Sequence, residues 1–179
     1  MKRGVVSVFG GSSPRPGTPA YDEAYRLGRL LAEEGYAVMT GGYGGTMEAA
    51  SKGAREAGGH VIGVTVAAFE RDGHHPNPYL DEVIRYERLP DRLLHLVTRC
   101  DAAVALRGGI GTLSEVSLLW SLLQSGQIEP KPFILLGEEW RTLFEMYYGN
   151  GEYISGQHMG LFRIARTPEQ VITLLRSWE

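Results

Sequence analysis

The chain alternates short apolar runs with amphipathic segments, and this alternation limits its fold more than any other feature. The run "VVSVFG" (5–10) is β-branched and ends in glycine, as expected of a strand buried on both faces of a parallel sheet. Ala24, Leu27 and Leu31 then recur at helical spacing until Gly35 ends the pattern. Strands that alternate with helices need right-handed crossovers, so we predict an α/β fold: a three-layer, Rossmann-like, doubly wound parallel sheet flanked by helices.

The same alternation continues along the chain without a linker, so we predict a single Rossmann-like domain over residues 1–179. Further strands are predicted at 36–40, 60–66, 82–86, 102–106, 133–137 and near 162–165. Helices are predicted at 20–34, 46–57, 91–99, 112–124, near 140–148 and from Pro168. Residues 67–80 hold Gly73, Pro76 and Pro78, which makes them too irregular for an element, and we predict a loop that borders a ligand.

Composition excludes several classes of function. A net charge of -3 without clustered Lys and Arg disfavours a nucleic-acid or membrane binder, because binding to phosphates depends on clustered cations. Cys100 is the only cysteine, so an intramolecular disulfide is impossible. The apolar run in the opening "MKRGVVSVFGG" is too short for a signal peptide, and we expect a cytoplasmic protein.

Three glycine-rich turns follow predicted strands: "GGSS" (10–13), "GGYGGTM" (41–47) and "GGIGT" (108–112). Ligands of doubly wound sheets bind outside the carboxyl ends of the strands, so these turns should converge on one crevice. Glycine permits close backbone approach and the following helix offers free N–H groups, which together favour a phosphate site. Tight packing of strand against helix is the alternative explanation. The turns lack a Walker lysine and do not strictly match G-x-G-x-x-G, which disfavours NTP hydrolysis and hydride transfer.

Thr112, Glu115 and Arg92 each have more than one interpretation. Thr112 and Glu115 have the T-x-x-E spacing of a helix capping box, which would satisfy free N–H groups. A carboxylate at the mouth of a phosphate-sized loop is also placed to orient water or to stabilise a developing cation, and both roles can coexist. Arg92 begins a predicted helix, and on sequence alone a solvated surface arginine is the simpler interpretation.

Longer stretches resemble a known family. The segment "DAAVALRGGIGTLSE" is similar to the motif P-G-G-x-G-T-x-x-E, and "TGGYGGTMEAASKGAREAGGHVIGV" is similar to a G-G-G-x-x-G-L-M region of the same family. That family is the LONELY GUY-like phosphoribohydrolases, formerly labelled possible lysine decarboxylases, and the resemblance extends from about Val5 to Leu136. It implies hydrolysis of AMP or a cytokinin riboside 5'-monophosphate to free base and ribose 5-phosphate, without a cofactor, by a homodimer or larger homo-oligomer.

The resemblance also implies roles for individual residues. Arg92 and Glu115 match the catalytic arginine and the closing glutamate of the family motifs. The phosphate-binding candidates from the three turns are Gly11, Ser12, Gly42, Gly45, Gly108, Gly109, Gly111 and Thr112. Glu70 is a further candidate for a ligand-contacting glutamate.

The chain departs from the family pattern at four positions. Arg107 replaces the motif proline, Leu93 a lysine, Thr40 the first glycine of the second turn, and Ser114 the first of two glutamates. Arg107 either contacts phosphate or projects into solvent. Because of these departures, a non-catalytic carrier of a nucleotide or cofactor is the alternative function.

The sequence also bears on lysine-dependent decarboxylation, on metal binding and on a subunit interface. The only lysines are Lys2, Lys52 and Lys131, and none has the context of a Schiff-base lysine, so we reject the decarboxylase label. His74 and His75 lack further ligands at metal-binding spacing, and we predict no metal. The apolar segment around Leu118–Leu123 predicts either a homodimer interface or a deeply buried helix.

Overall fold

The computed structural model describes residues 3–149 and 151–178, and seven parallel strands form one sheet in the order β4-β3-β2-β1-β5-β6-β7. The strands are β1 (Val5–Phe9), β2 (Ala37–Thr40), β3 (Val61–Val66), β4 (Glu82–Tyr86), β5 (Ala102–Ala105), β6 (Phe133–Leu136) and β7 (Arg163–Ala165). The helices are α1 (Pro19–Glu33), α2 (Thr46–Glu56), α3 (Ala67–Arg71), α4 (Leu89–Thr98), α5 (Ile110–Gln124), α6 (Glu138–Tyr148), α7 (Gly156–Met159) and α8 (Pro168–Arg176). The predicted α/β Rossmann-like fold is confirmed.

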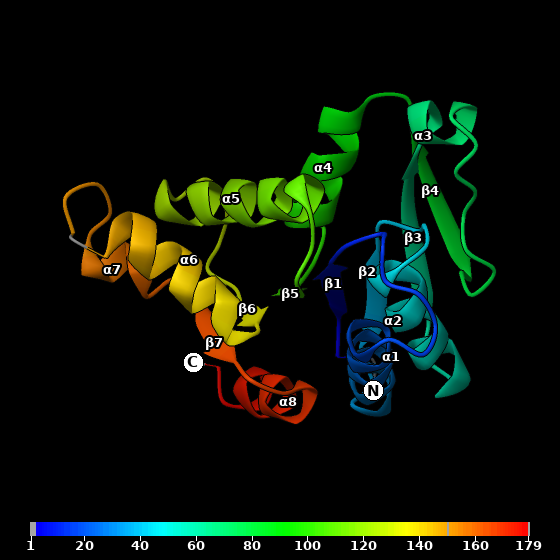
Figure 1. Cartoon of the computed structure of the whole chain (residues 1–179), viewed down its shortest axis with the longest axis horizontal. Helices are drawn as coiled ribbons and strands as arrows, with labels where there is room; N and C mark the ends of the chain where they lie inside the picture. The colour runs from blue at the N-terminus through cyan, green and yellow to red at the C-terminus, as the bar shows by residue number, and fades with distance from the viewer. Residues whose placement is uncertain (1–2, 150, 179) are drawn as a thin grey trace.

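Successive side chains of the inner strands enter opposite cores, which is why these strands appear as nearly continuous apolar runs. Val8 and Val104 face a cluster shared with α1, α2 and α8. Phe9 and Ala105 face a second cluster shared with α4, α5 and α6. Figure 1 shows α1, α2 and α8 on one side of the sheet and α4 and α5 on the other.

The sheet has its topological switch point at β1, which pairs with β2 on one side and β5 on the other. The strand order runs outward from β1 to β4 and then resumes at β5 on the opposite side. Loops that leave the carboxyl ends of β1 and β5 therefore diverge and leave a crevice between them. The first, second and third glycine-rich turns follow β1, β2 and β5 respectively, so all three stand at this edge.

The structure corrects three expectations about elements. Residues 67–80 are not uniformly irregular, because Ala67–Arg71 form α3, and Gly73 at φ +86° follows where that helix ends. Helix α5 begins at Ile110, before the predicted start at Thr112, and α4 begins at Leu89 because Pro90 suits a first turn. The short α7 was not predicted. Within residues 3–149 and 151–178, every helix is too short or too polar to cross a membrane.

Candidate functional site

A pocket of about 370 Å³ lies where the three glycine-rich turns meet. The first turn contributes Gly10–Ser12, the second Tyr43 and Met47, and the third Gly109–Thr112. Arg92 and Glu115 lie in the same pocket, so the predicted convergence of the turns is confirmed. A second hollow, of about 310 Å³, is lined by α1, α8 and residues just before α8, and its charged side chains include the ion pair Arg26–Glu169.

Backbone contacts hold the turns against one another. The backbone N–H and the hydroxyl of Thr46 both donate to the Gly11 carbonyl, at 2.9 and 3.0 Å. The Gly11 N–H in turn donates to the Arg107 carbonyl at 3.3 Å. Gly45 has φ +72° and packs so closely on Gly11 and Ser12 that a Cβ there would overlap their backbone. The turns therefore form one rigid unit.

The predicted phosphate-binding residues fall into two groups. Gly11, Ser12, Gly109, Gly111 and Thr112 line the pocket. The other three glycines shape the turns by close packing: Gly42 against Thr65, Gly45 against the first turn, and Gly108 against Thr112.

The amino end of α5 opens into the pocket. Gly109 is its N-cap and Thr112, which is 3% exposed, lies inside the first turn. The capping-box interpretation is therefore wrong, because Thr112 does not occupy the cap position and Glu115 lies in the second turn. With glycine at the cap, the free N–H groups of the first turn and the positive end of the helix dipole remain available to an anion.

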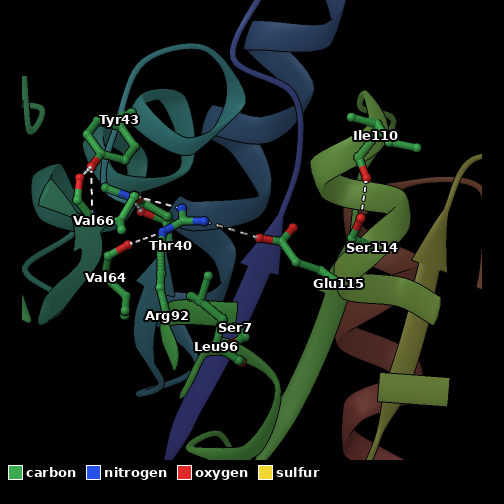
Figure 2. Close-up of polar contacts among 12 residues, drawn as sticks. Ser7, Thr40, Tyr43, Val64, Val66, Arg92, Leu96, Ile110, Ser114 and Glu115 are labelled. Atoms are coloured by element: carbon green, nitrogen blue, oxygen red, sulfur yellow. Dashed lines mark hydrogen bonds and ion pairs between the residues drawn. The ribbon is translucent and has the colours of Figure 1, made fainter. Parts of the chain in front are cut away.

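Arg92 is buried, and the surface-arginine interpretation is wrong. It lies on α4 with only 6% of its surface exposed. Its Nε donates to the Val64 carbonyl at 2.7 Å and its Nη2 to the Gly41 carbonyl at 3.1 Å. These two bonds fix the guanidinium and leave Nη1 directed at Glu115 (Figure 2).

Glu115 faces Arg92 from α5, with its Oε1 4.0 Å from Nη1 of the arginine. Burial raises the pKa of the Glu115 carboxyl to about 7, and the positive charge of Arg92 opposes this rise only in part. A carboxyl with such a pKa exchanges a proton near neutrality, which suits general acid–base chemistry and the stabilisation of a developing cation.

Several other predicted candidates lie elsewhere. Arg107 pairs with Glu139 at 3.0 Å with 70% of its side chain exposed, and Glu70 accepts a hydrogen bond from Arg85 at 2.8 Å. Ser114 donates to the Ile110 carbonyl at 2.8 Å on the exposed side of α5 (Figure 2).

The lysines have structural partners. Lys131 donates to the Cys100 carbonyl, and Lys52 lies 5.8 Å from the centre of the Tyr79 ring. Lys2 lies outside the described residues. Within residues 3–149 and 151–178, no cluster of three His, Cys, Asp or Glu side chains is arranged to hold a metal ion.

Sequence reasoning missed the aromatic and apolar side chains that line the pocket, namely Tyr43, Met47, Phe69, His74 and Ile110. A signal was present, because Tyr43 and Met47 interrupt the second glycine-rich turn. Phe69 and His74 belong to the segment predicted to border a ligand, but sequence alone does not tell which of its side chains face inward.

Comparison with known proteins gives three informative matches. An uncharacterized protein from Archaeoglobus fulgidus is 39% identical over 118 residues, which is 66% of this chain and 74% of that protein. A probable cytokinin riboside 5'-monophosphate phosphoribohydrolase from Oryza sativa subsp. japonica is 38% identical over 135 residues, covering 73% of this chain and 57% of the relative. The solved molybdenum cofactor binding protein from Rippkaea orientalis is 31% identical, with a TM-score of 0.77, over 99% of this chain and 98% of that one.

The fold and pocket define a Rossmann-like α/β protein with a pocket at the switch point of its sheet. The sequence model of the SLOG cluster 4 family matches residues 3–157, and the chain belongs to that family. The resemblance to the LONELY GUY-like proteins, predicted from the glycine motifs, is confirmed by this family match and by the similarity to the Oryza sativa relative.

Proposed function

We propose that the protein hydrolyses the N-glycosidic bond of a nucleoside 5'-monophosphate, AMP or a cytokinin riboside monophosphate, to free base and ribose 5-phosphate. The observation that carries the proposal is the buried pair of Arg92 and Glu115 beside the glycine-rich turns. The name of the Oryza sativa relative supports the same reaction. On this proposal the chain acts as one nucleotide-binding domain, in the cytoplasm, as a homodimer or larger homo-oligomer.

The chemistry follows from where charge develops. As the bond between the anomeric carbon and the base nitrogen breaks, the ribose becomes cationic and the base takes the electron pair. Ionised Glu115 stabilises the cation and accepts a proton from the water whose oxygen joins the anomeric carbon. The departing base receives a proton from the carboxyl or from solvent. Arg92 contacts the ligand and positions Glu115.

The glycine-rich turns bind the 5'-phosphate at the amino end of α5, through Gly11, Ser12, Gly109, Gly111 and Thr112. Binding energy from this remote phosphate positions the reacting bond. Adenosine, which lacks the phosphate, is therefore expected to react with a kcat/KM roughly 100-fold lower than AMP.

A non-catalytic carrier is the second candidate. The similarity to the molybdenum cofactor binding protein spans 99% of this chain at 31% identity, which supports this second candidate. Leu93 and Ser114 also replace polar family residues near the pair. On this alternative the same pocket binds a phosphorylated cofactor as cargo, and Glu115 performs no reaction.

The deciding experiment measures adenine and ribose 5-phosphate after incubation of the protein with AMP, with adenosine and the Glu115→Gln protein in parallel. We expect release from AMP, and a decrease in kcat of about 10³-fold in the variant. Glu115→Gln should melt no lower than the parent, because it removes an unfavourable buried charge. Absence of release from a panel of nucleoside monophosphates, together with a ligand freed by mild denaturation, would establish the carrier instead.

A further inference from the structure

Three aromatic side chains line one side of the pocket, and we call Tyr43, Phe69 and His74 the aromatic wall. The ring centres of Tyr43 and Phe69 lie 5.7 Å apart in an edge-to-face arrangement. His74 packs edgewise on both, with centre distances of 6.3 Å to Tyr43 and 6.2 Å to Phe69. The three rings come from the second glycine-rich turn, from α3 and from the segment after it.

The wall lies outside the two main core clusters, although its innermost ring, Tyr43, is only 5% exposed. Of the residues that the structure describes, the two core clusters include neither Tyr43 nor Phe69. Phe69 is half-buried and His74 is exposed, yet both line the pocket. Phe69 and His74 therefore offer apolar surface to a ligand, and the buried ring of Tyr43 packs behind them.

Hydrogen bonds within the protein hold the backbone and the tyrosine of the wall in place. The Tyr43 hydroxyl donates to the Val66 carbonyl at 3.0 Å and accepts from the Val66 N–H at 2.9 Å (Figure 2). The side chain of Asn77, which is 7% exposed, donates to the Tyr43 carbonyl at 3.1 Å. The His74 N–H donates to the Phe69 carbonyl at 2.9 Å. The rings are thus preorganised, which lowers the entropy lost on binding.

The wall and the anion site lie on opposite sides of the reactive pair. The Arg92 guanidinium is 5.8 Å from the centre of the Tyr43 ring and 6.0 Å from that of Phe69. In Figure 2, Arg92 and Glu115 lie between Tyr43 and Ile110, and Ile110 begins the helix whose amino end faces the pocket. A ligand that spans the pocket meets aromatic rings, then the charged pair, then free N–H groups.

We propose that the aromatic wall is a subsite for a planar heterocyclic ring, with Phe69 as the residue that determines selection for it. The ligand class is a planar ring joined through a short polar linker to a phosphate. This inference rests on the proposed function, and it identifies where the base of the nucleotide is held. A phosphorylated pterin has the same shared chemistry, so the test includes both compounds.

The experiment distinguishes the contribution of the ring to binding from the contribution of the phosphate. Calorimetry gives the Kd of AMP, neopterin monophosphate and ribose 5-phosphate for two proteins, Glu115→Gln and Glu115→Gln/Phe69→Leu, in which turnover is blocked. We expect Phe69→Leu to raise about tenfold the Kd of whichever ring compound binds. The Kd of ribose 5-phosphate should stay within about twofold of its value for the Glu115→Gln protein. An equal loss for all ligands, or no loss for any, would overturn the proposal, as would failure of both ring compounds to bind the Glu115→Gln protein.

Two further variants guard the interpretation. His74→Ala removes an exposed ring with little effect on folding and should weaken ring binding about threefold, which keeps the test valid if Phe69→Leu folds poorly. Tyr153→Leu removes a ring that is 73% exposed outside the pocket lining and should change no Kd.

The result also distinguishes this inference from the proposed function. If neopterin monophosphate binds, AMP does not, and Phe69→Leu weakens the binding, then the wall is a ring subsite and the proposed nucleotide hydrolysis is wrong. If AMP is hydrolysed but Phe69→Leu changes the Kd of ligands with and without a ring equally, then the proposed hydrolysis is correct and the ring subsite is wrong.

Discussion

Two arginine–glutamate pairs flank the third glycine-rich turn, and the longer one matters more. Arg107 and Glu139 approach to 3.0 Å, but their side chains are 70% and 55% exposed. Arg92 and Glu115 are 4.0 Å apart, and their side chains are only 7% and 9% exposed. Water screens the first pair, so this pair contributes little to stability despite its short distance. The second pair interacts in a low-dielectric environment, where each charge depends on its neighbours.

Burial accounts for the chemistry of the inner pair. Glu115 has a pKa of about 7 because it is desolvated, and the single cation nearby is also bound to the Val64 and Gly41 carbonyls. The comparison teaches that exposure, rather than separation, decides which carboxyl has its pKa shifted by its surroundings. Substitutions in the two pairs are therefore expected to differ in the size of their effects.

The largest effect is expected from Arg92→Met. Removal of the guanidinium leaves two buried carbonyls without their donor and Glu115 without its counter-charge. We expect a loss of about 3 kcal/mol in the free energy of unfolding at pH 8, measured by urea denaturation. Loss of the positive charge also raises the pKa of Glu115 further, because Arg92 lowers it in the parent protein.

Two comparisons test the cause of this loss. At pH 5, where Glu115 is protonated in the folded state, Arg92→Met should be less destabilising than at pH 8. Adding Glu115→Gln to Arg92→Met should recover part of the stability at pH 8, because no buried carboxylate remains. Equal destabilisation at both pH values would show that the lost hydrogen bonds, rather than the charge, dominate.

The next effect is a pH dependence with opposite signs for stability and activity. The folded-state pKa of Glu115 is raised from 4.5 to about 7, so folding favours its protonated form. Its contribution is fully present below pH 4.5 and is lost as the pH rises through 7, a change on the order of 3 kcal/mol. The active form is ionised, so kcat/KM for AMP should rise over the upper part of the same range, around pH 7.

Glu115→Gln and Glu139→Gln provide the matched pair for this measurement. The difference in unfolding free energy between the parent and Glu115→Gln should grow from pH 4.5 to 7, whereas Glu139→Gln should follow the parent. A kcat/KM that falls with rising pH would reverse the assignment and make protonated Glu115 the active form.

Much of the fold could be predicted because the relevant forces are local. The inner strands of the sheet are β-branched or apolar runs, whereas the edge strands β4 and β7 carry charged residues. Strands β1 and β2 lead into glycine-rich turns that are evident in the sequence. Helix α3 escaped prediction because five residues before Gly73 carry too short a pattern. The start of α5 was misplaced because Thr112 has the spacing of a cap, although Gly109 occupies that position.

The candidate site was less accessible because it is assembled by tertiary contacts. The motif resemblance indicated Arg92 and Glu115, but only the packing of α4 against β3 reveals that Arg92 is buried. The aromatic wall joins residues from separate segments through contacts such as that of Asn77 with Tyr43. No spacing rule links such positions, so sequence patterns predicted the glycine-rich turns that line the pocket but not its aromatic side chains.

The smallest effect is expected from Arg107→Ala, and it tests the outer pair directly. Arg107 stands where the family motif has proline, but its guanidinium is bound to Glu139 and solvent rather than turned into the pocket. We expect a change in the free energy of unfolding within about 0.5 kcal/mol, and a KM for AMP within about twofold of the parent. Raising the salt concentration should shrink even this difference, because exposed charges are screened. An increase in KM of tenfold or more, with kcat unchanged, would mean that Arg107 turns inward to bind phosphate when substrate is present, and that the outer pair is a resting state of the third turn.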